Sequence, residues 1–238
     1  MLYNDDCIEV LKKIKKGSID MIFADPPYFL SNGGVSIRSG KVVSVNKGEW
    51  DKKENYSDVL KFTHLWLKGC YNVLKNEGTI WVTGTYHNIF DIERNMKEIG
   101  FKIINIIIWQ KIDPPPLIFK DKFKFSYEFI IRAKKGKKHY FDYNSMYNIN
   151  NDEMQDIWKL PSVAIKEKKF GKHPTQKPEC LLERIIICST KEEETILDPF
   201  MGSGTSCVVA KRLNRKWIGI EKDKGYYMIA NNRINDKN

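Results

Sequence analysis

The chain has 238 residues, 42% of them hydrophobic, and a formal net charge of +10, which fits a basic globular protein of one domain. No apolar run approaches the roughly 18 residues of a membrane span, and the start of the chain lacks a signal-peptide pattern, so we expect a cytoplasmic protein. The five cysteines are scattered without a Cys-x-x-Cys pair, which argues against a disulfide framework and against a zinc site.

The first half of the chain alternates helical and strand patterns. Residues 5–14 are predicted to be a turn followed by a short helix, amphipathic spacing predicts a helix over 56–74, and a further helix is predicted over 89–99. Apolar runs predict strands over 19–24, 78–83 and 101–109. Residues 31–50 are polar and glycine-rich, and loops of this length are usually lids or disordered. We therefore predict a mobile lid at 31–50.

The second half contains the least regular part of the chain. A strand is predicted over 125–131, a basic run follows at 132–138, and 140–172 is irregular. We predict that 113–172 is an insertion on one face of the domain. Regular patterns then return as a helix that starts near Pro178, a strand over 194–197, a helix over 205–213, a strand over 216–220 and a helix over 226–234. Strands that alternate with helices predict an α/β fold with a mainly parallel sheet.

Residues 198–205, Asp-Pro-Phe-Met-Gly-Ser-Gly-Thr, form a turn between a short strand and a helix. The first turn of a helix has free N–H groups, and glycines let a polar ligand approach the backbone, so this pattern predicts a pocket. Glu221 ends the next strand, where Rossmann-like folds place an acid that binds ribose hydroxyls. The third glycine of the dinucleotide fingerprint is absent, and similar turns occur where no ligand binds. The turn alone leaves both interpretations open.

A second motif, Asp25-Pro26-Pro27-Tyr28, follows the predicted strand 19–24. The prolines cannot continue a sheet, so they fix an acid and an aromatic ring at the carboxyl end of the strand, the edge where α/β sheets bind ligands. The Asp25 carboxylate and the Pro26 carbonyl are two acceptors, and with the Tyr28 ring they suit a planar group that bears an NH2. A capping Asp beside a surface Tyr is the alternative.

Together, the two motifs resemble those of the amino-methylating DNA methyltransferases that depend on S-adenosylmethionine. The order here, catalytic motif before cofactor motif, is the permuted order of their β class. Further matching segments lie at 23–29, 48–51, 109–111, 173–178 and 219–221, and they resemble the HinfI and DpnA type. The short length and the loop at 31–34 most resemble the DpnA type, the adenine methyltransferases of GATC restriction–modification systems. The resemblance implies one catalytic domain, 1–238, with a circularly permuted Rossmann-like fold and helices on both faces of the sheet.

The resemblance also implies roles for the matching residues. The catalytic group would be Asp25, Pro26, Pro27 and Tyr28. The residues implied to bind S-adenosylmethionine, which leaves as S-adenosylhomocysteine, are Asp6, Cys7, Thr175, Lys177, Asp198, Phe200, Gly202, Ser203, Gly204, Thr205 and Glu221. Lys177 also suits a surface lysine at a helix start, and Cys7 also suits the core. No metal is expected.

Adenine N6 is a poor nucleophile because its lone pair is delocalised into the ring. Hydrogen bonds from its amino group to Asp25 and the Pro26 carbonyl would localise that pair, so that N6 attacks the methyl group directly, after the base has left the helical stack. Methylation of cytosine C5 would need a nucleophilic cysteine beside a proline, and no Pro-Cys dipeptide occurs.

The expected partner is DNA, double-stranded or also single-stranded, and no membrane. Lysines and arginines at 132–138 and 166–172 suit phosphate contacts, 113–172 suits target recognition, and 31–50 suits closure on DNA. A homodimer and a partner restriction endonuclease are further implications of the class. Three alternatives stay open: a cytosine-N4 methyltransferase, an RNA or small-molecule methyltransferase, and a non-catalytic nucleic-acid-binding module. A lysine-rich surface without a polyanionic partner would also produce the net charge.

Overall fold

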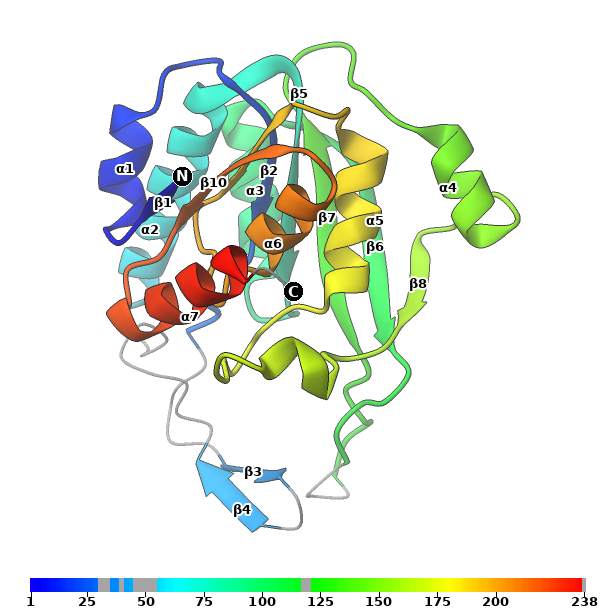
Figure 1. Ribbon diagram of the computed structural model, residues 1–238. Helices are drawn as coiled ribbons and strands as arrows, with labels where there is room; N and C mark the ends of the chain where they lie inside the picture. The colour runs from blue at the N-terminus through cyan, green and yellow to red at the C-terminus, as the bar shows by residue number, and fades with distance from the viewer. Residues whose placement is uncertain (30–34, 39–40, 45–54, 117–120, 237–238) are drawn as a thin grey trace.

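A computed structural model describes residues 1–29, 35–38, 41–44, 55–116 and 121–236. An eight-stranded sheet forms the centre of the molecule (Figure 1). Its strands, in spatial order, are β1 (Leu2–Tyr3), β10 (Lys216–Ile220), β9 (Thr195–Asp198), β2 (Ile19–Ala24), β5 (Leu74–Gly84), β7 (Tyr127–Lys134), β6 (Lys102–Lys111) and β8 (Ile157–Leu160). Neighbouring strands of this sheet are parallel, except that β7 runs antiparallel to both β5 and β6.

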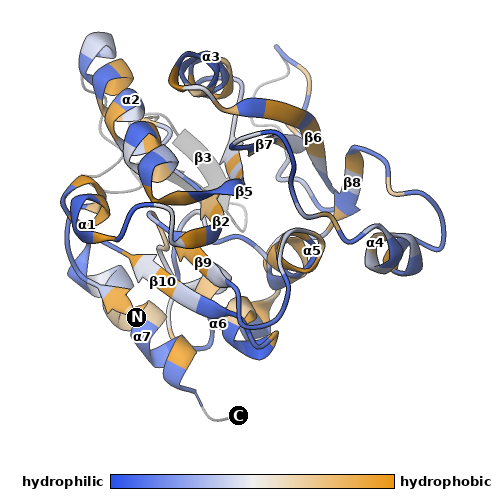
Figure 2. Cartoon of the chain, turned by 90° about the horizontal axis from the view of Figure 1, so that it is seen from above, coloured by the Kyte–Doolittle hydropathy of each residue, from blue (hydrophilic) through white to orange (hydrophobic). Residues whose placement is uncertain are grey.

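Helices cover both faces of the sheet, as Figure 2 shows from above. One face packs against α1 (Cys7–Lys13), α2 (Tyr56–Val73) and α3 (Ile89–Ile99). The other packs against α4 (Tyr143–Asn150), α5 (Glu179–Ser189) and α6 (Thr205–Arg212). The last helix, α7 (Lys224–Asn235), packs on α6. This arrangement agrees with the predicted α/β fold.

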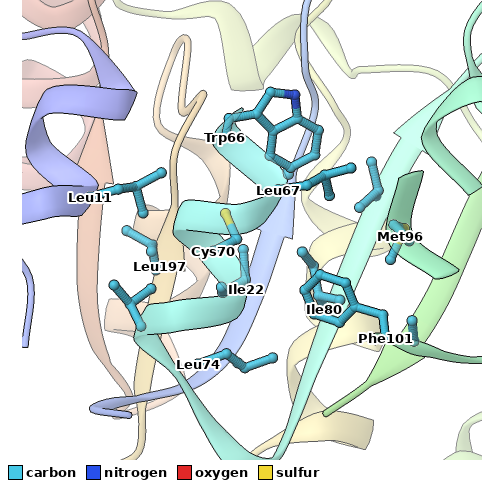
Figure 3. Close-up of a cluster of buried hydrophobic side chains, with 14 of the residues drawn as sticks. Leu11, Ile22, Trp66, Leu67, Cys70, Leu74, Ile80, Met96, Phe101 and Leu197 are labelled. Atoms are coloured by element: carbon cyan, nitrogen blue, oxygen red, sulfur yellow. The ribbon is translucent and has the colours of Figure 1, made fainter. Parts of the chain in front are cut away.

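Alternation along the strands builds two apolar cores. In β2, Ile22 and Ala24 point to the first face, whereas Met21 and Phe23 point to the second. In the first core, Trp66 and Leu67 of α2 are fully buried against the sheet (Figure 3). Strands buried on both sides are nearly continuous apolar runs, which is why the inner parallel strands β2, β9 and β10 could be located from sequence.

The strand order places a topological switch point between β9 and β2. From β9 the chain crosses through α6 to β10 on one side, whereas from β2 it crosses through α2 to β5 on the other. Ligands of open α/β sheets bind in the crevice outside the carboxyl ends of the strands at such a point. Both predicted motifs follow these two strands directly.

The predicted insertion 113–172 includes a strand of the central sheet. β7 lies between β5 and β6 and forms ladders with both, so residues 127–134 belong to the core of the fold. The segments outside β7 include α4, the edge strand β8 and a short 3-10 helix (Ile165–Lys168). Target recognition by this interval stays a prediction and concerns those flanking segments.

Residues 31–50, predicted to be a lid, are described only in part. β3 (Val35–Arg38) and β4 (Lys41–Ser44) pair as an antiparallel hairpin separate from the main sheet. The rest of 31–50 lies outside the described residues. Among the residues that the structure describes, no helix is long and apolar enough to cross a membrane.

Candidate functional site

A cavity of about 620 Å³ opens at the switch point between β9 and β2. Its walls are the segments that follow β2, β9 and β10, together with the turn before α1 and the segment before α5. The predicted catalytic and cofactor-binding residues that line this cavity are Asp6, Cys7, Asp25, Pro26, Pro27, Tyr28, Thr175, Lys177, Asp198, Phe200, Gly202, Ser203, Thr205 and Glu221. Gly204 is the one predicted site residue outside the lining. Two motifs that lie far apart in the sequence thus meet at one cavity.

The glycine turn leads from β9 into α6. Gly202 and Gly204 have φ angles of +51° and +76°, a region that glycine enters without steric cost. A Cβ on Gly204 would lie 2.9 Å from the Cβ of Ala230, so this glycine faces α7. Gly204 therefore serves close helix packing, whereas Gly202 faces the cavity beside His173.

Arg233 of α7 stabilises this turn through hydrogen bonds. Its Nη1 donates to the carbonyl and the hydroxyl of Ser203 at 2.9 and 3.1 Å, and to the Thr205 hydroxyl at 2.9 Å. Its Nη2 pairs with Glu179 at 3.1 Å. A buried guanidinium with four partners fixes the turn rigidly, although nothing in the sequence around Arg233 indicated this role.

Asp198, the last residue of β9, stabilises the glycine turn through hydrogen bonds. Its carboxylate accepts hydrogen bonds from the Phe200 N–H at 3.0 Å and from the Ser206 hydroxyl. Burial raises the pKa of Asp198 to about 7, against the lowering effect of these two donors. This carboxyl group can therefore hold a proton near neutral pH.

Glu221 presents two acceptors to the cavity. Its Oε2 accepts from the Gly202 N–H at 2.9 Å and its Oε1 from the Asp223 N–H at 2.8 Å. A carboxylate oxygen has two lone-pair positions, so each oxygen keeps one for a ligand. Two such acceptors side by side suit a pair of vicinal hydroxyls.

The turn before α1 also lines the cavity. Asp6 caps α1 by accepting from the Ile8 N–H at 2.9 Å. Cys7 is buried, and burial raises the pKa of its thiol to about 12. The thiol is therefore neutral, so Cys7 contributes shape rather than a nucleophile.

Asp25 lines the cavity directly after the end of β2. Its Oδ1 accepts from the Thr83 hydroxyl at 2.5 Å and from the Tyr28 hydroxyl at 2.8 Å. Its Oδ2 accepts from the Lys177 ammonium at 2.5 Å. The Asp-Pro-Pro-Tyr segment is thus fixed by β5 and by the segment before α5.

Glu128 and Lys111 complete this cluster, and sequence reasoning missed both. Glu128 of β7 lies 3.5 Å from the Lys177 ammonium and 2.6 Å from that of Lys111 on β6. Burial would raise the pKa of Glu128, but the two ammonium groups lower it to about 2. An acid inside the apolar run of strand 127–134 was the available signal, because a buried charge requires a partner.

Lys177 is buried and charged. Burial would lower the pKa of its ammonium, but the carboxylates of Asp25 and Glu128 raise it overall. Burial and the same two carboxylates raise the pKa of Tyr28, whose hydroxyl therefore stays a donor. The resemblance implied a role for Lys177 at the methyl donor, whereas its observed contacts are with the Asp25 cluster.

The cavity is acidic although the chain is basic. Its lining contains the carboxyl groups of Asp5, Asp6, Asp25, Asp198, Glu221 and Asp223, against the lysines Lys177 and Lys222. Such a lining favours a ligand with positive charge. Within the described segments, no group of three or more His, Cys, Asp or Glu side chains could hold a metal ion.

The two basic runs predicted to contact phosphates lie at different edges of the sheet. In the β5–β7 ladder, Phe129 pairs with Gly84 at the carboxyl end of β5, whereas Lys134 pairs with Thr79, which lies earlier in that strand. The run 132–138 therefore leads away from the carboxyl end of β5, and Arg132 is buried between the rings of Trp81 and Phe141. Phosphate contact by the run 132–138 stays a prediction.

The run 166–172 lies on the cavity side. It leads directly into His173, which lines the cavity, and Lys166, Lys169 and Lys172 are exposed. This second run is therefore placed where phosphates could be reached.

Residues 19–232 match the family N6_N4_Mtase, described as DNA methylase. The chain is similar to Type II methyltransferase M2.MboI of Moraxella bovis, at 47% identity over 99% of this chain and 87% of the relative. It is also similar to Type II methyltransferase M2.DpnII of Streptococcus pneumoniae, at 48% identity over 100% of this chain and 90% of the relative.

Solved structures show the same fold. The M1.HpyAVI–SAM complex has a TM-score of 0.74 at 27% identity, covering 99% of both chains. The cytosine-N4-specific PvuII DNA methyltransferase has a TM-score of 0.79 at 21% identity, covering 100% of this chain and 86% of that one. The second likeness concerns the fold alone.

Proposed function

The chain belongs to the DNA methylase family that its residues 19–232 match, and on that premise we propose that it transfers a methyl group from S-adenosylmethionine to adenine N6 in DNA. The observation that carries the proposal is the meeting of two acceptor sets in one cavity. Glu221 and the glycine turn line the cavity, and so do Asp25 and Pro26. The proposed target sequence is GATC, from the resemblance to the DpnA type.

Family membership and the solved relatives confirm four predictions made from sequence. These are the amino-methylating DNA methyltransferase family, the Rossmann-like methyltransferase fold, the enzyme class and S-adenosylmethionine as methyl donor. The roles of individual residues are part of the proposal.

The cavity residues fit S-adenosylmethionine. When bound, this cofactor supplies an electrophilic methyl group on a sulfonium ion. The acidic lining suits its sulfonium and amino charges, and the two remaining acceptor positions of Glu221 suit its ribose hydroxyls. The ring of Phe200 packs edge-on against that of Trp66, with 5.2 Å between the ring centroids. Phe200 thus offers an apolar wall of the cavity beside Gly202.

Asp25 and Pro26 hold the amino group of the target base. A carboxylate has about four acceptor positions, and three on Asp25 accept from Thr83, Tyr28 and Lys177, so one remains for an amino hydrogen. The Pro26 carbonyl accepts the second hydrogen. Both bonds localise the N6 lone pair, which forms the new bond to carbon as the carbon–sulfur pair returns to sulfur. The extra proton of N6 then passes to Asp25 and on to water.

We assign stacking on the extruded base to the Tyr28 ring. It lines the cavity, and its hydroxyl is fixed by Asp25 and Glu128. Because burial keeps the phenol neutral by raising its pKa, the ring presents an uncharged π face. The base must leave the duplex to reach this position, which makes the enzyme a base-flipping one.

Recognition surfaces and partners belong to the proposal as well. We assign phosphate contacts to 166–172 and target reading to 31–50 and to the parts of 113–172 outside β7. The DNA partner follows from the family, whereas a homodimer and a partner restriction endonuclease are inferences from the resemblance. A cytoplasmic location in a bacterial-type cell fits DNA as substrate.

The test is methyl transfer from labelled S-adenosylmethionine to unmethylated bacterial DNA, followed by nucleoside mass spectrometry and mapping of modified sites. The proposal expects N6-methyladenine, mapped to GATC. N4-methylcytosine would keep the fold and overturn the base. N6-methyladenine at another sequence would overturn GATC only. No methylated nucleoside from a protein that binds the cofactor would favour the RNA methyltransferase or the non-catalytic module.

A further inference from the structure

The Asp25 cluster contains more charge than the reaction requires. Two carboxylates, Asp25 and Glu128, and two ammonium groups, Lys177 and Lys111, form a chain of ion pairs in the order 25–177–128–111. Their side chains are largely buried, with exposed fractions of 12%, 13%, 6% and 22% in the order Asp25, Glu128, Lys177, Lys111. The four charges sum to zero.

Lys177 is central to this arrangement because it touches both carboxylates. Its ammonium lies 2.5 Å from Asp25 and 3.5 Å from Glu128, and it also approaches the Thr175 carbonyl and the Tyr28 hydroxyl at 3.4 Å. Its stem enters from the segment before α5, so no neighbouring residue of Asp25 could supply this charge.

We propose that Lys177 and Glu128 are positioning residues for Asp25: the Lys177 ammonium offsets the charge of the Asp25 carboxylate and holds it toward the base, and Glu128 fixes that ammonium from β7. The proposal rests on the function proposed above, in which Asp25 accepts the amino hydrogen. Neither residue touches the base or forms a bond with the methyl group.

Without the Lys177 charge, the two carboxylates of the cluster would repel each other. The Tyr28 hydroxyl lies 2.8 Å from Asp25 and 3.3 Å from Glu128, so the two carboxylates are neighbours across one oxygen. Neighbouring buried carboxylates share a proton because both cannot remain charged. On the side of β9, the charge of Asp25 is one of the causes that raise the pKa of Asp198, whereas Lys111 faces Glu128 and not Asp25. A protonated Asp25 would lose the acceptor that the amino group needs.

The variants are Lys177→Met, Glu128→Gln, the double variant E128Q/K177M, and Lys177→Arg. The control is Lys75→Met, because Lys75 pairs at 2.7 Å with the largely buried Asp20 of β2, at the strand end remote from the cavity. Methyl transfer is measured against pH for each protein, and S-adenosylmethionine affinity is measured separately by calorimetry. Proton uptake at Asp25 is followed by carbon NMR of labelled aspartate carboxyl groups, with Asp25→Asn to assign the signal.

The proposal expects the methyl-transfer rate of Lys177→Met to fall by about tenfold or more at neutral pH. The acidic limb of its pH–rate profile should move up by about one to two pH units. The Asp25 carboxyl signal should titrate at correspondingly higher pH, which requires no DNA. Glu128→Gln alone should not shift the acidic limb to higher pH. In the double variant, Glu128→Gln should bring the acidic limb back toward its wild-type pH. Lys177→Arg should keep the wild-type limb, and Lys75→Met should change nothing.

Two results overturn the proposal. One is an Asp25 signal and an acidic limb that do not move in Lys177→Met. The other is a loss of cofactor affinity in Lys177→Met with an unchanged pH profile, which would place Lys177 at the methyl donor instead. Full activity of Asp25→Asn would refute the proposed role of Asp25 itself, a separate outcome from either of these.

Discussion

The Nζ atom of Lys177 lies 2.5 Å from Oδ2 of Asp25, although 152 positions separate the two residues. The contact joins the segment that leads into α5 to the strand end that carries Asp-Pro-Pro-Tyr. It also means that the segment implied to hold the methyl donor contacts the group assigned to the base. The two halves of the site are thus coupled through one buried ion pair.

Replacing Thr83 by valine should slow methyl transfer about tenfold without unfolding the protein. The Thr83 hydroxyl donates to Asp25 at 2.5 Å, and one hydrogen bond to a charged acceptor is worth about 1.5 kcal/mol. Valine has nearly the same shape, so packing is kept. Single-turnover rates check this, and Thr63→Val, which removes a buried hydroxyl bonded to the Val59 carbonyl in α2, is the matched control. Equal rates for both variants would contradict it.

Glu221→Gln should weaken S-adenosylmethionine binding by about 10- to 100-fold, because one of its two charged acceptors becomes a donor. The Gly202 and Asp223 N–H groups compete for the acceptor that remains. Calorimetry measures the loss, with Glu193→Gln as control because its side chain is 74% exposed. Unchanged affinity in Glu221→Gln would remove Glu221 from the binding site.

Gly204→Ala should destabilise the protein by about 2–4 kcal/mol. The new Cβ would lie 2.9 Å from the Cβ of Ala230 and 3.2 Å from its Cα, at a φ of +76°. Gly17→Ala is the control, because Gly17 has a φ of +61° but no atom within 4 Å of a Cβ. It should lose only the strain of the backbone, about 1–2 kcal/mol. The free energy of unfolding of both variants is measured by denaturant titration. Equal losses of unfolding free energy would show that close packing of Gly204 against α7 does not contribute to stability.

Asp198→Asn should become more stable relative to wild type as pH rises. The pKa of Asp198 is raised from 3.8 to about 7 in the folded protein, so the folded state binds a proton that the unfolded chain releases in this window. The stability that this proton contributes is complete below pH 3.8 and is lost as pH rises toward about 7. The change is at most on the order of 4 kcal/mol.

Unfolding free energies of wild type and Asp198→Asn between pH 4 and pH 8, about the range of the shift, measure this difference. Other groups titrate alike in both proteins and cancel. Parallel curves would contradict the raised pKa of Asp198.

Much of the fold was predictable because its signals are local. The helix over 89–99 and the strand over 19–24 were predicted at their observed bounds, since their apolar spacing and flanking Gly and Pro residues are unambiguous. The edge strand β1 was missed because two residues carry no periodicity, and its pairing with β10 is non-local. The sheet position of β7 was missed because strand order is set by long-range pairing.

The residues of the site also divide into those with a local sequence signal and those whose role depends on distant partners. Asp25 and Glu221 could be found because each ends an apolar strand and carries a local motif. Thr83 and Arg233 could not, because their importance comes from partners about 30 or more positions away, whereas for Glu128 the sequence offered an acid inside an apolar strand but not its partners. Gly204 matched a motif, yet its backbone faces α7, and only the packing of the last helix reveals that.

The central claim is that Asp25 accepts the amino hydrogen of the target adenine. Its most direct test is single-turnover methyl transfer from prebound labelled S-adenosylmethionine to GATC-containing DNA, with wild type beside Asp25→Asn. The account predicts a fall of about 100-fold or more in the rate of N6-methyladenine formation, with cofactor affinity retained. An Asp25→Asn protein that methylates adenine at the wild-type rate would contradict it.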